Sequence, residues 1–480
     1  MALFNSGNSK KDAIKVLSLF SGAGGLDHGF FMNHKFEVSF ALDYNDVAAR
    51  TYSINHGFTL ARIENGHAAQ RKAFVLGDIK KINMQNLIVL KPSVVIGGPP
   101  CQDFSMVRGP DSERRGIAEA RGRLYAYFVK ALINLNPLFF VFENVPGLAY
   151  KDERAAFRII KDDFTNLTSR VEKIEEIAGN GFVGAANGYD LLFSQIADAS
   201  AFGVPQRRRR LIILGARNGI FDISNSELDR AKEAVNIALN PKDSIFTKFP
   251  LTAMEAFSGK VIPELLQEYE EITEDWKIAL SGRKAMLDKW TMGGLAFTGD
   301  IVKDYIFSNG VKNYTKVDLK RAWGEHKKVL AELKYYHRPL DDASDFDDGS
   351  NNIPLETRRV IERMKNIPPG ENYSFVNNTR FQVKGNDISL VYRRLHPLKP
   401  AYTVLARGGG GTHGYHYLRN RSALTNRERA RLQSFPDTFM FRGTVSEQRM
   451  QIGEAVPPLM GKAISNAIAE LYRRFSLDTS

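Results

Sequence analysis

Short apolar runs alternate with polar or glycine-rich segments through the first 216 residues of the chain. The runs are rich in β-branched and aromatic residues, which is typical of buried strands. Helical periodicity lies between some of them, at residues 26–33 and 124–135. Strands that alternate with helices predict an α/β fold with a doubly wound sheet. We expect its strands at residues 16–20, 36–42, 74–76, 93–96, 139–142, 189–196 and 211–214.

Three successive predicted strands end in a glycine-rich or acidic tip. The first runs into a glycine turn at residues 21–25, the second into Asp43 and the third into Gly77-Asp78. Glycines let a ligand approach the backbone, and the amino end of the next helix offers free amides, so the tips predict a nucleotide-type cradle. Taken alone, Asp43 either binds ribose hydroxyls or is a solvated loop residue, and Asp78 either accepts from an exocyclic amine or is solvated. Asp27 replaces the third glycine of the dinucleotide fingerprint, which favours a ligand without a pyrophosphate.

Cys101 is the only cysteine among the 480 residues. It follows the strand at residues 93–96 on a loop that reads Gly-Gly-Pro-Pro. A lone cysteine is more often a small buried hydrophobe. A stiff loop beyond the carboxyl end of a strand instead presents the side chain at the ligand edge of the sheet. The position therefore favours a nucleophile.

Charged residues follow the later strands. Glu143 comes directly after an apolar strand and is either a helix cap or an active-site acid. Four consecutive arginines at residues 207–210 are typical of a solvated surface that faces nucleic acid. If they enter a strand, Arg208 and Arg210 share one face. The arginine-rich residues 108–123 indicate either a mobile loop that closes over a phosphate backbone or a solvated connector.

Composition narrows the class of protein. A length of 480 residues allows two or three domains. The net charge of +12 suggests a polyanionic partner such as nucleic acid. A single cysteine excludes an internal disulfide and a cysteine-based zinc site. The polar amino end and the lack of a run of eighteen apolar residues predict a cytoplasmic protein that does not enter membranes.

The regular alternation stops near residue 218, and a charged, aromatic region follows to residue 392. Helical runs are predicted at residues 264–277 and 317–336, and a solvated turn at the acidic residues 341–348, which fail the calcium-loop register. His413 and His416 have no third ligand type nearby, which argues against a metal. Thr425 with Glu428 predicts the capping box of a basic helix, and residues 459–475 a closing amphipathic helix.

Six blocks of the sequence, in this order, resemble the motifs of DNA (cytosine-5)-methyltransferases of the prokaryotic restriction–modification type. They cover residues 20–25, 98–105, 143–145, 206–210, 427–436 and 451–458. The resemblance implies an S-adenosylmethionine-dependent methyltransferase sheet domain at residues 1–217, completed by residues 448–480. Residues 218–447 would form a smaller target-recognition domain that faces it across a basic cleft.

The resemblance also implies a mechanism. Cys101 would add to carbon 6 of a flipped-out cytosine, so that carbon 5 becomes nucleophilic enough to take a methyl group. Glu143 would hydrogen-bond the exocyclic amine and nitrogen 3, Arg210 would contact the base carbonyl and orient Glu143, and Arg208 would assist. Expected DNA contacts are Gln102, Ser105, Arg108, Arg123, Arg407, Gly409 and Gly410.

The methyl donor would be S-adenosylmethionine, with no metal. Two positions depart from the family: Asp43 is shorter than the usual Glu, and Glu454 replaces the usual Asn, where it either binds the donor's ammonium group or is structural. The expected partner is duplex DNA. The enzyme would either act beside a cognate restriction endonuclease encoded nearby or be an orphan modification enzyme, and it is expected to be a monomer associated with the nucleoid. The residues implied for the donor are Phe20, Ser21, Gly22, Gly24, Gly25, Asp43, Tyr44, Asp78, Ile79, Pro100, Leu124, Glu454 and Ala455.

Three other functions fit parts of the pattern. A transfer-RNA cytosine-5 methyltransferase shares the motif order, but its cysteine loop usually has Pro and Thr where this chain has Asp103 and Ser105. A catalytically inactive DNA-binding paralogue is disfavoured because Cys101, Glu143 and Arg210 are all present. A nicotinamide-dependent oxidoreductase is disfavoured by the failed dinucleotide fingerprint.

Overall fold

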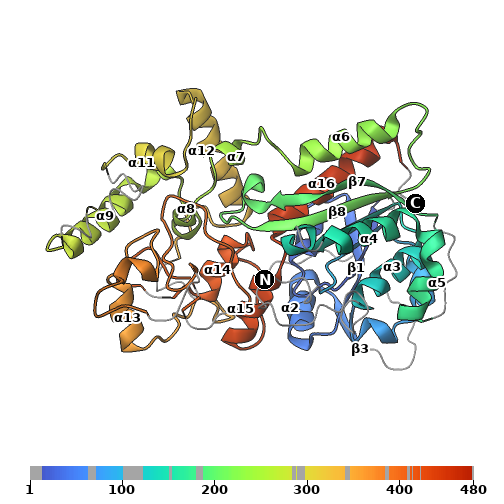
Figure 1. The fold of residues 1–480 in the computed structure, drawn as a ribbon, viewed down its shortest axis with the longest axis horizontal. Coiled ribbons are helices and arrows are strands. Elements are labelled where there is room, and N and C mark those ends of the chain that lie inside the picture. Colours follow the sequence, from blue (N-terminus) through green and yellow to red (C-terminus); the bar gives the residue numbers. More distant parts are fainter. Residues whose placement is uncertain are drawn as a thin grey trace. The chain divides into compact units, whose positions relative to one another are not determined.

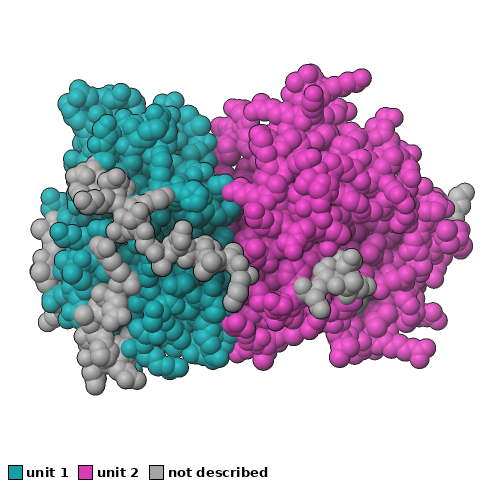
Figure 2. Space-filling view, turned by 180° about the vertical axis from the view of Figure 1, so that it is seen from behind, with its two compact units in different colours: residues 1–197, 209–240, 461–480 teal, residues 198–208, 241–460 magenta. Residues whose placement is uncertain are grey.

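A computed structural model describes most of the chain as two compact units (Figure 2). Unit 1 contains residues 1–197, 209–240 and 461–480, and unit 2 contains residues 198–208 and 241–460. None of the helices in the described ranges is long and apolar enough to cross a lipid bilayer. The described residues are 13–62, 72–100, 123–150, 154–179, 187–283, 288, 298–340, 346–383, 389–407, 411–412, 414–421 and 423–477.

Unit 1 is built on a β-sheet flanked by helices (Figure 1). The sheet has eight strands in the order β3-β4-β2-β1-β5-β6-β8-β7. Neighbouring strands from β3 to β6 pair in parallel, and β8 runs antiparallel to β6. The predicted α/β fold is confirmed. The strands are β1 (Ile14–Leu19), β2 (Phe36–Asp43), β3 (Thr59–Arg62), β4 (Ala73–Leu76), β5 (Val94–Gly97), β6 (Phe139–Asn144), β7 (Tyr189–Asp198) and β8 (Arg209–Arg217).

Helices cover both faces of this sheet. Alternate side chains of β1, β2, β5, β6 and β8 join one apolar cluster with α3 (Arg123–Leu135), α4 (Arg154–Thr165), α5 (Leu167–Ala178) and the 3₁₀ segment Met84–Leu90. Phe140 and Phe142 point into this cluster, whereas Phe139 points to the other face and contacts Tyr472 of α16 (Pro458–Phe475). The other helices of unit 1 are α1 (Gly25–Phe31), α2 (Asp46–His56) and α6 (Glu227–Leu239).

The final helix, α16, packs tightly against α1. A Cβ atom added to Gly461 would stand 2.5 Å from the carbonyl oxygen of Leu26, so only glycine fits there. Asn33 Nδ2 donates to Asn466 Oδ1 at 2.9 Å, and Ser465 Oγ lies 3.3 Å from the carbonyl oxygen of Gly29. The chain's last helix therefore returns to the element that follows the first strand.

Unit 2 is mainly helical and has its own aromatic core around Trp276. Helices α9 and α12 occupy the regions where the sequence predicts helical runs. The Arg394 guanidinium is fully buried, lies over the Trp276 ring and donates to main-chain carbonyls from two separate segments, including those of Ile367, Met364 and His416. The helices are α7 (Ile245–Lys248), α8 (Ala253–Ser258), α9 (Leu266–Leu280), α11 (Ile301–Ser308), α12 (Lys316–Glu332), α13 (Arg358–Met364), α14 (Asn426–Leu432) and α15 (Val445–Glu454).

Two sequence predictions in unit 2 have different outcomes. The capping box of Thr425 and Glu428 is confirmed at the start of α14. The solvated turn is wrong for Asp348, whose buried carboxylate pairs with Arg427 Nη2 at 2.8 Å and accepts from the amide of Phe441. An isolated acidic run resembles a surface loop, but here it supplies the counter-charge for a buried arginine.

Candidate active site

The sheet changes direction at the pair β1 and β5. On one side of β1 the sheet continues with β2, β4 and β3, whereas β5 and β6 lie on the other side. Leu19 and Gly97, the last residues of the two strands, stand opposite each other in the register. A crevice at the carboxyl ends of strands is expected at such a switch point, where α/β proteins bind ligands. The glycine turn and the loop that leads to Cys101 leave the sheet on either side of it.

Asp43 joins the three strand tips on one side of the switch point. Its Oδ2 accepts from the amide of Gly22 at 2.9 Å and its Oδ1 accepts from the amide of Asn45 at 2.9 Å. Its carbonyl oxygen accepts from the amide of Gly77, the residue before Asp78. Burial raises the pKa of Asp43, and the amides of Asn45 and Gly22 oppose that shift. The predicted glycine turn, Asp43 and Asp78 segment are thus held together.

The glycine turn has the conformation that its residues predict. Gly22 and Gly24 have φ angles of 53° and 88°, and Phe20 before them also has a positive φ. Ser21 N donates to the carbonyl oxygen of Leu42, and Ser21 Oγ accepts from the amide of Leu42. No heavy atom of the described residues lies within 4 Å of a Cβ added to Gly22, so this side of the turn is open.

A buried polar cluster that sequence reasoning missed lies beneath the turn. Tyr52 Oη donates to Asp27 Oδ1 at 2.8 Å, and the Tyr52 ring would be 2.6 Å from a Cβ added to Gly24. Burial raises the pKa of Asp27 to about 6, against hydrogen bonds from Ser18 and Tyr52. His56 completes the packing next to Tyr52. The failed fingerprint position, Asp27, was the available signal, because a carboxylate in an apolar helix needs a buried partner.

On the other side of the switch point, Glu143 lies between Arg210 and the loop that leads to Cys101. Arg210 Nε is 2.9 Å from Glu143 Oε1, and each side chain is 12% exposed. A Cβ added to Gly98 would stand 2.7 Å from Glu143 Oε2, and Asn144 Nδ2 donates to the carbonyl oxygen of Pro99 at 3.2 Å. Burial lowers the pKa of the Arg210 guanidinium, and the Glu143 carboxylate opposes that shift. The base of the loop and the carboxylate are therefore fixed together.

The remaining predicted donor-site residues of unit 1 differ in exposure. Tyr44 is 74% exposed and directly follows Asp43, whereas Ile79 is buried. Asp78 caps the 3₁₀ segment Ile79–Lys81 by accepting from the amide of Lys80. Pro100 is exposed, and Leu124 in the first turn of α3 is half-buried against the apolar cluster.

The predicted site residues of unit 2 have other surroundings. Arg208 is fully buried and donates to the carbonyl oxygens of Val404 at 3.1 Å and Gly453 at 2.7 Å. It thus orders backbone segments of unit 2, whereas Arg210 in unit 1 pairs with Glu143. Arg407 is exposed, Glu454 is the exposed last residue of α15, and Ala455 follows it as the helix cap. Cys101, Gln102, Ser105, Arg108, Gly409 and Gly410 lie outside the described residues, and of Arg123 only its place at the start of α3 is described.

The fold and these strand ends define an α/β protein with its ligand edge at the switch point of the sheet. Residues 14–470 match the family model of C-5 cytosine-specific DNA methylases, so the chain belongs to that family. It is a DNA (cytosine-5-)-methyltransferase, which excludes the oxidoreductase alternative.

Relatives of known function agree. The chain is 45% identical over 472 residues to the DNA (cytosine-5-)-methyltransferase M.ApeKI of Aeropyrum pernix, covering 95% of this chain and 98% of the relative. It is 30% identical to the Type II methyltransferase M.NgoFVII of Neisseria gonorrhoeae, covering 98% of this chain and 91% of the relative. A solved structure of a candidate DNA modification methyltransferase from an E. coli prophage has the same fold, with a TM-score of 0.54, 21% identity and coverage of 96% of this chain and 100% of that one.

Proposed function

We propose that the enzyme methylates carbon 5 of a flipped-out cytosine in a specific duplex DNA sequence through a transient bond between Cys101 and carbon 6. The observation that carries the proposal is the position of Glu143, fixed between Arg210 and Gly98 at the base of the cysteine loop. A flipped base that meets Cys101 would meet this carboxylate as well. The target cytosine has to leave the stack because neither group can reach it inside a duplex.

The residues around Asp43 fit S-adenosylmethionine as the methyl donor. The open side of Gly22 allows close approach of a ligand to the backbone, and the exposed ring of Tyr44 suits stacking with an adenine. Asp43 would accept from the ribose hydroxyls and Asp78 from the adenine amine. When bound, the donor supplies an electrophilic methyl group on a sulfonium.

The protein groups would act on the cytosine in sequence. The Cys101 thiolate adds to carbon 6 and forms a carbon–sulfur bond, while the ring electrons move towards carbon 5 and nitrogen 3. Glu143 holds the proton at nitrogen 3 and accepts from the exocyclic amine, and Arg210 keeps its carboxylate in place while donating to the base carbonyl. After methylation, a base removes the carbon 5 proton, the electrons return to the ring and the carbon–sulfur bond breaks. Arg208 would assist indirectly, because it directly precedes β8, the strand that carries Arg210.

A covalent trap tests this mechanism directly. In a duplex with 5-fluorocytosine at the target position, the elimination step is blocked, so the wild-type enzyme with S-adenosylmethionine should give an adduct stable to denaturing electrophoresis. The Cys101→Ser variant should bind the same duplex and give no adduct. Tritiated methyl transfer to transfer RNA is the matched control for the RNA alternative and should be absent. An undiminished adduct with Cys101→Ser, or methyl transfer to RNA alone, would refute the proposal.

We also propose that the enzyme protects host DNA against a cognate endonuclease. The relatives named above include a Type II methyltransferase, which supports this assignment. Bisulfite sequencing of DNA from expressing cells should reveal one short methylated sequence, and that DNA should resist an endonuclease of the same specificity. Methylation of cytosines regardless of context would contradict a protective role.

A further inference from the structure

Helix α14 carries three buried arginines. Arg427, Arg429 and Arg431 are each at most 2% exposed, although their alternation with polar residues is that of a solvated basic helix. A buried guanidinium is stable when carboxylates and carbonyls satisfy its five N–H groups. The three arginines therefore need acceptors inside unit 2.

Two of the three are neutralised by a carboxylate. Arg427 donates to the carboxylate of Asp348, the hydroxyl of Ser350 and the carbonyl oxygen of Phe439, and its guanidinium lies over the ring of Phe346. Arg431 pairs with Asp437 through both Nε and Nη2 and donates to three main-chain carbonyls. Both side chains thus hold the core of unit 2 together, and the charge of each is already balanced.

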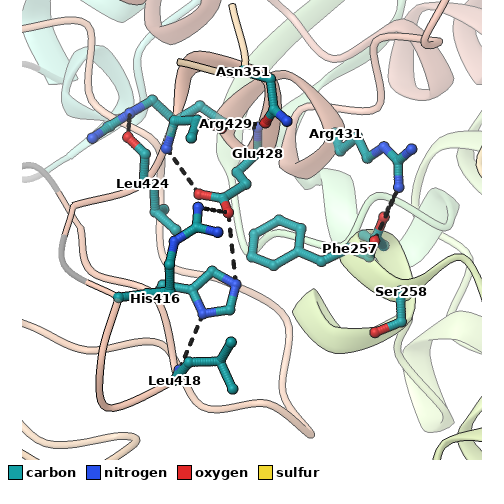
Figure 3. Close-up of polar contacts among 12 residues, drawn as sticks. Phe257, Ser258, Asn351, His416, Leu418, Leu424, Glu428, Arg429 and Arg431 are labelled. Carbon is teal, nitrogen blue, oxygen red and sulfur yellow. Dashed lines mark hydrogen bonds and ion pairs between the residues drawn. The ribbon is translucent and has the colours of Figure 1, made fainter. Parts of the chain in front are cut away.

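Arg429 differs from its neighbours because no carboxylate of the described residues pairs with it, although Arg427 Nη1 is likewise buried without a hydrogen-bond partner among those residues. Arg429 Nε makes one long hydrogen bond of 3.4 Å to the carbonyl oxygen of Leu424, and its buried Nη2 has no hydrogen-bond partner among the described residues. Figure 3 shows its guanidinium directed away from the carboxylate of Glu428, which instead accepts from Arg421 and the amide of Thr425. Burial, together with the charge of Arg449, lowers the pKa of Arg429 to about 9, although Glu428 and Glu356 oppose that shift. A buried cation with unused donors is costly unless an anion supplies the acceptors.

The Arg429 side chain lines a pocket that is open to solvent and that is otherwise formed largely by apolar side chains such as Leu390, Leu405 and Leu432. Arg393 is also in the lining, and its guanidinium lies on the ring of Tyr402, 3.2 Å from the ring centre. Stacking of this kind orients a guanidinium while its edge stays available to donate to an oxyanion. Neither Arg393 nor Arg429 forms an ion pair with a carboxylate of the described residues.

The pocket lies in a positively charged part of unit 2. Burial lowers the pKa of Lys399, and the nearby charges of Arg207 and Arg393 lower it further. Glu356 is an acidic group that acts on Arg429 from outside α14, and burial raises the pKa of this carboxyl despite Arg449 and Arg429. Two guanidinium groups in one pocket, with a lysine and another arginine nearby, match a tetrahedral oxyanion better than a neutral ligand.

We propose that the pocket lined by Arg429 binds one phosphate of the DNA backbone and that Arg393 and Arg429 hold this phosphate. The family assignment does not by itself require such a site. The proposal rests on DNA as the substrate. DNA presents a negative charge about every 1.7 Å along its axis, and guanidinium groups bind phosphate oxygens in pairs. Such a contact positions the duplex on unit 2 without reading its sequence.

The test uses the full-length enzyme and a short target duplex. Arg393→Gln and Arg429→Met should each weaken DNA binding about tenfold at moderate salt and reduce the slope of log K against log salt by about 1. Arg321→Gln removes the same charge from an exposed position on α12 and should leave the slope unchanged. A cooperative thermal unfolding transition shows that each variant is folded. If Arg429→Met does not fold, Arg393→Gln alone tests the proposal.

Methylphosphonate substitution identifies the ligand. Neutral linkages placed one at a time along both strands should weaken wild-type binding at the contacted phosphate, and Arg393→Gln should lose no further affinity at that linkage. Competition by inorganic phosphate at the same concentrations should be negligible, since a free ion lacks the other DNA contacts. The proposal is overturned if folded variants keep the wild-type salt slope. It is also overturned if the loss of DNA affinity from each neutral linkage adds in full to the loss from the variant at every position. Covalent trapping by these variants at low salt should persist, so that a failure here is distinguishable from a failure of the Cys101 mechanism.

Discussion

Arg210 Nε lies 2.9 Å from Glu143 Oε1 because β8 runs antiparallel to β6 at the edge where both residues stand. In the register Glu143 is opposite Ile212, so a strand that enters the sheet in the reverse direction brings a cation to the carboxyl end of a parallel strand. Each side chain is 12% exposed, so the pair is largely shielded but open to a ligand. The ion pair therefore fixes the direction of the Glu143 carboxylate.

Glu143→Gln should lower kcat by about 10²- to 10⁴-fold, because the amide can neither hold the proton at nitrogen 3 nor pair with Arg210. Single-turnover methyl transfer measures this loss, and DNA affinity should stay near the wild-type value. The exposed neighbour Arg209→Gln is the matched control for a change at this sheet edge. A Glu143→Gln enzyme with wild-type single-turnover rates would remove the carboxylate from the mechanism.

Gly98→Ala should displace the Glu143 carboxylate, since the added methyl group would stand 2.7 Å from Oε2. A shift of this size in a catalytic group costs about 10- to 100-fold in kcat. Gly324→Ala on α12 is the control, because its methyl group meets no described atom within 4 Å and should stabilise the helix by about 0.5–1 kcal/mol. Equal activity of both alanine variants would show that the loop can move away from the carboxylate at no cost.

Much of the sheet could be predicted from sequence because its strands are short apolar runs that end at glycine, proline or polar residues. All seven predicted strands are present, and the tips at residues 21–25, Asp43 and Asp78 do lie together. The eighth strand, β3, was not predicted because its side chains are mostly exposed and carry no apolar pattern. Its pairing with β4 depends on the sheet edge, which is a tertiary feature.

The buried polar groups could not be predicted because their partners are distant in the chain. The arginines of α14 have the sequence pattern of a solvated helix, yet they are buried. Arg431 donates to the carbonyl oxygens of Ala256 and Phe257, and Arg427 donates to the carboxylate of Asp348. A local pattern reports the charge of a residue but not the acceptors that fold around it. The same reasoning applies to Arg208. The run of four arginines suggested a solvated surface, and the family resemblance implied a supporting role in catalysis, whereas the side chain donates to the carbonyl oxygens of Val404 and Gly453.

Asp27→Asn should make the stability of the enzyme less dependent on pH between about 4 and 6. Burial raises the pKa of Asp27 from 3.8 to about 6, so between these values the folded protein holds a proton that the unfolded chain has lost. The contribution of Asp27 to stability is thus complete below pH 3.8 and is lost as pH rises through 6. Wild type should lose about 2–3 kcal/mol relative to Asp27→Asn across this range, measured by urea unfolding.

The control for this prediction is Glu233→Gln, an exposed carboxyl on α6 that should not change the profile. The amide oxygen of the Asp27→Asn variant would still accept from the Tyr52 hydroxyl, so the comparison isolates the charge. Parallel profiles for wild type and Asp27→Asn would mean that Asp27 titrates as it does in the unfolded chain, and that the cluster under the glycine turn is more hydrated than its 1% exposure indicates.

His326 should stabilise unit 2 at acidic pH and lose that effect as pH rises. The ring is fully buried, with Nδ1 2.8 Å from Glu255 Oε1 and Nε2 2.9 Å from the carbonyl oxygen of Phe249. Since both neighbours are acceptors, both nitrogens satisfy them only when protonated. Burial alone lowers the pKa of His326, but the Glu255 charge and the two hydrogen bonds outweigh it, so the pKa is raised above 6.5.

The sign of the pH effect follows from that shift. Below pH 6.5 the folded and unfolded chains are both protonated and the interaction is complete, whereas above the raised pKa the folded ring loses its proton and the interaction is lost. Glu255 on α8 and His326 on α12 join these two helices. Amide hydrogen exchange in both helices, corrected for the intrinsic pH dependence of the exchange rate, should therefore become faster as pH rises. His326→Gln should abolish this dependence and cost about 3–5 kcal/mol at acidic pH, because it leaves Glu255 buried without its cation. The exposed His337→Gln should do neither. A wild-type profile with no slope would mean that folding leaves the pKa of His326 unchanged.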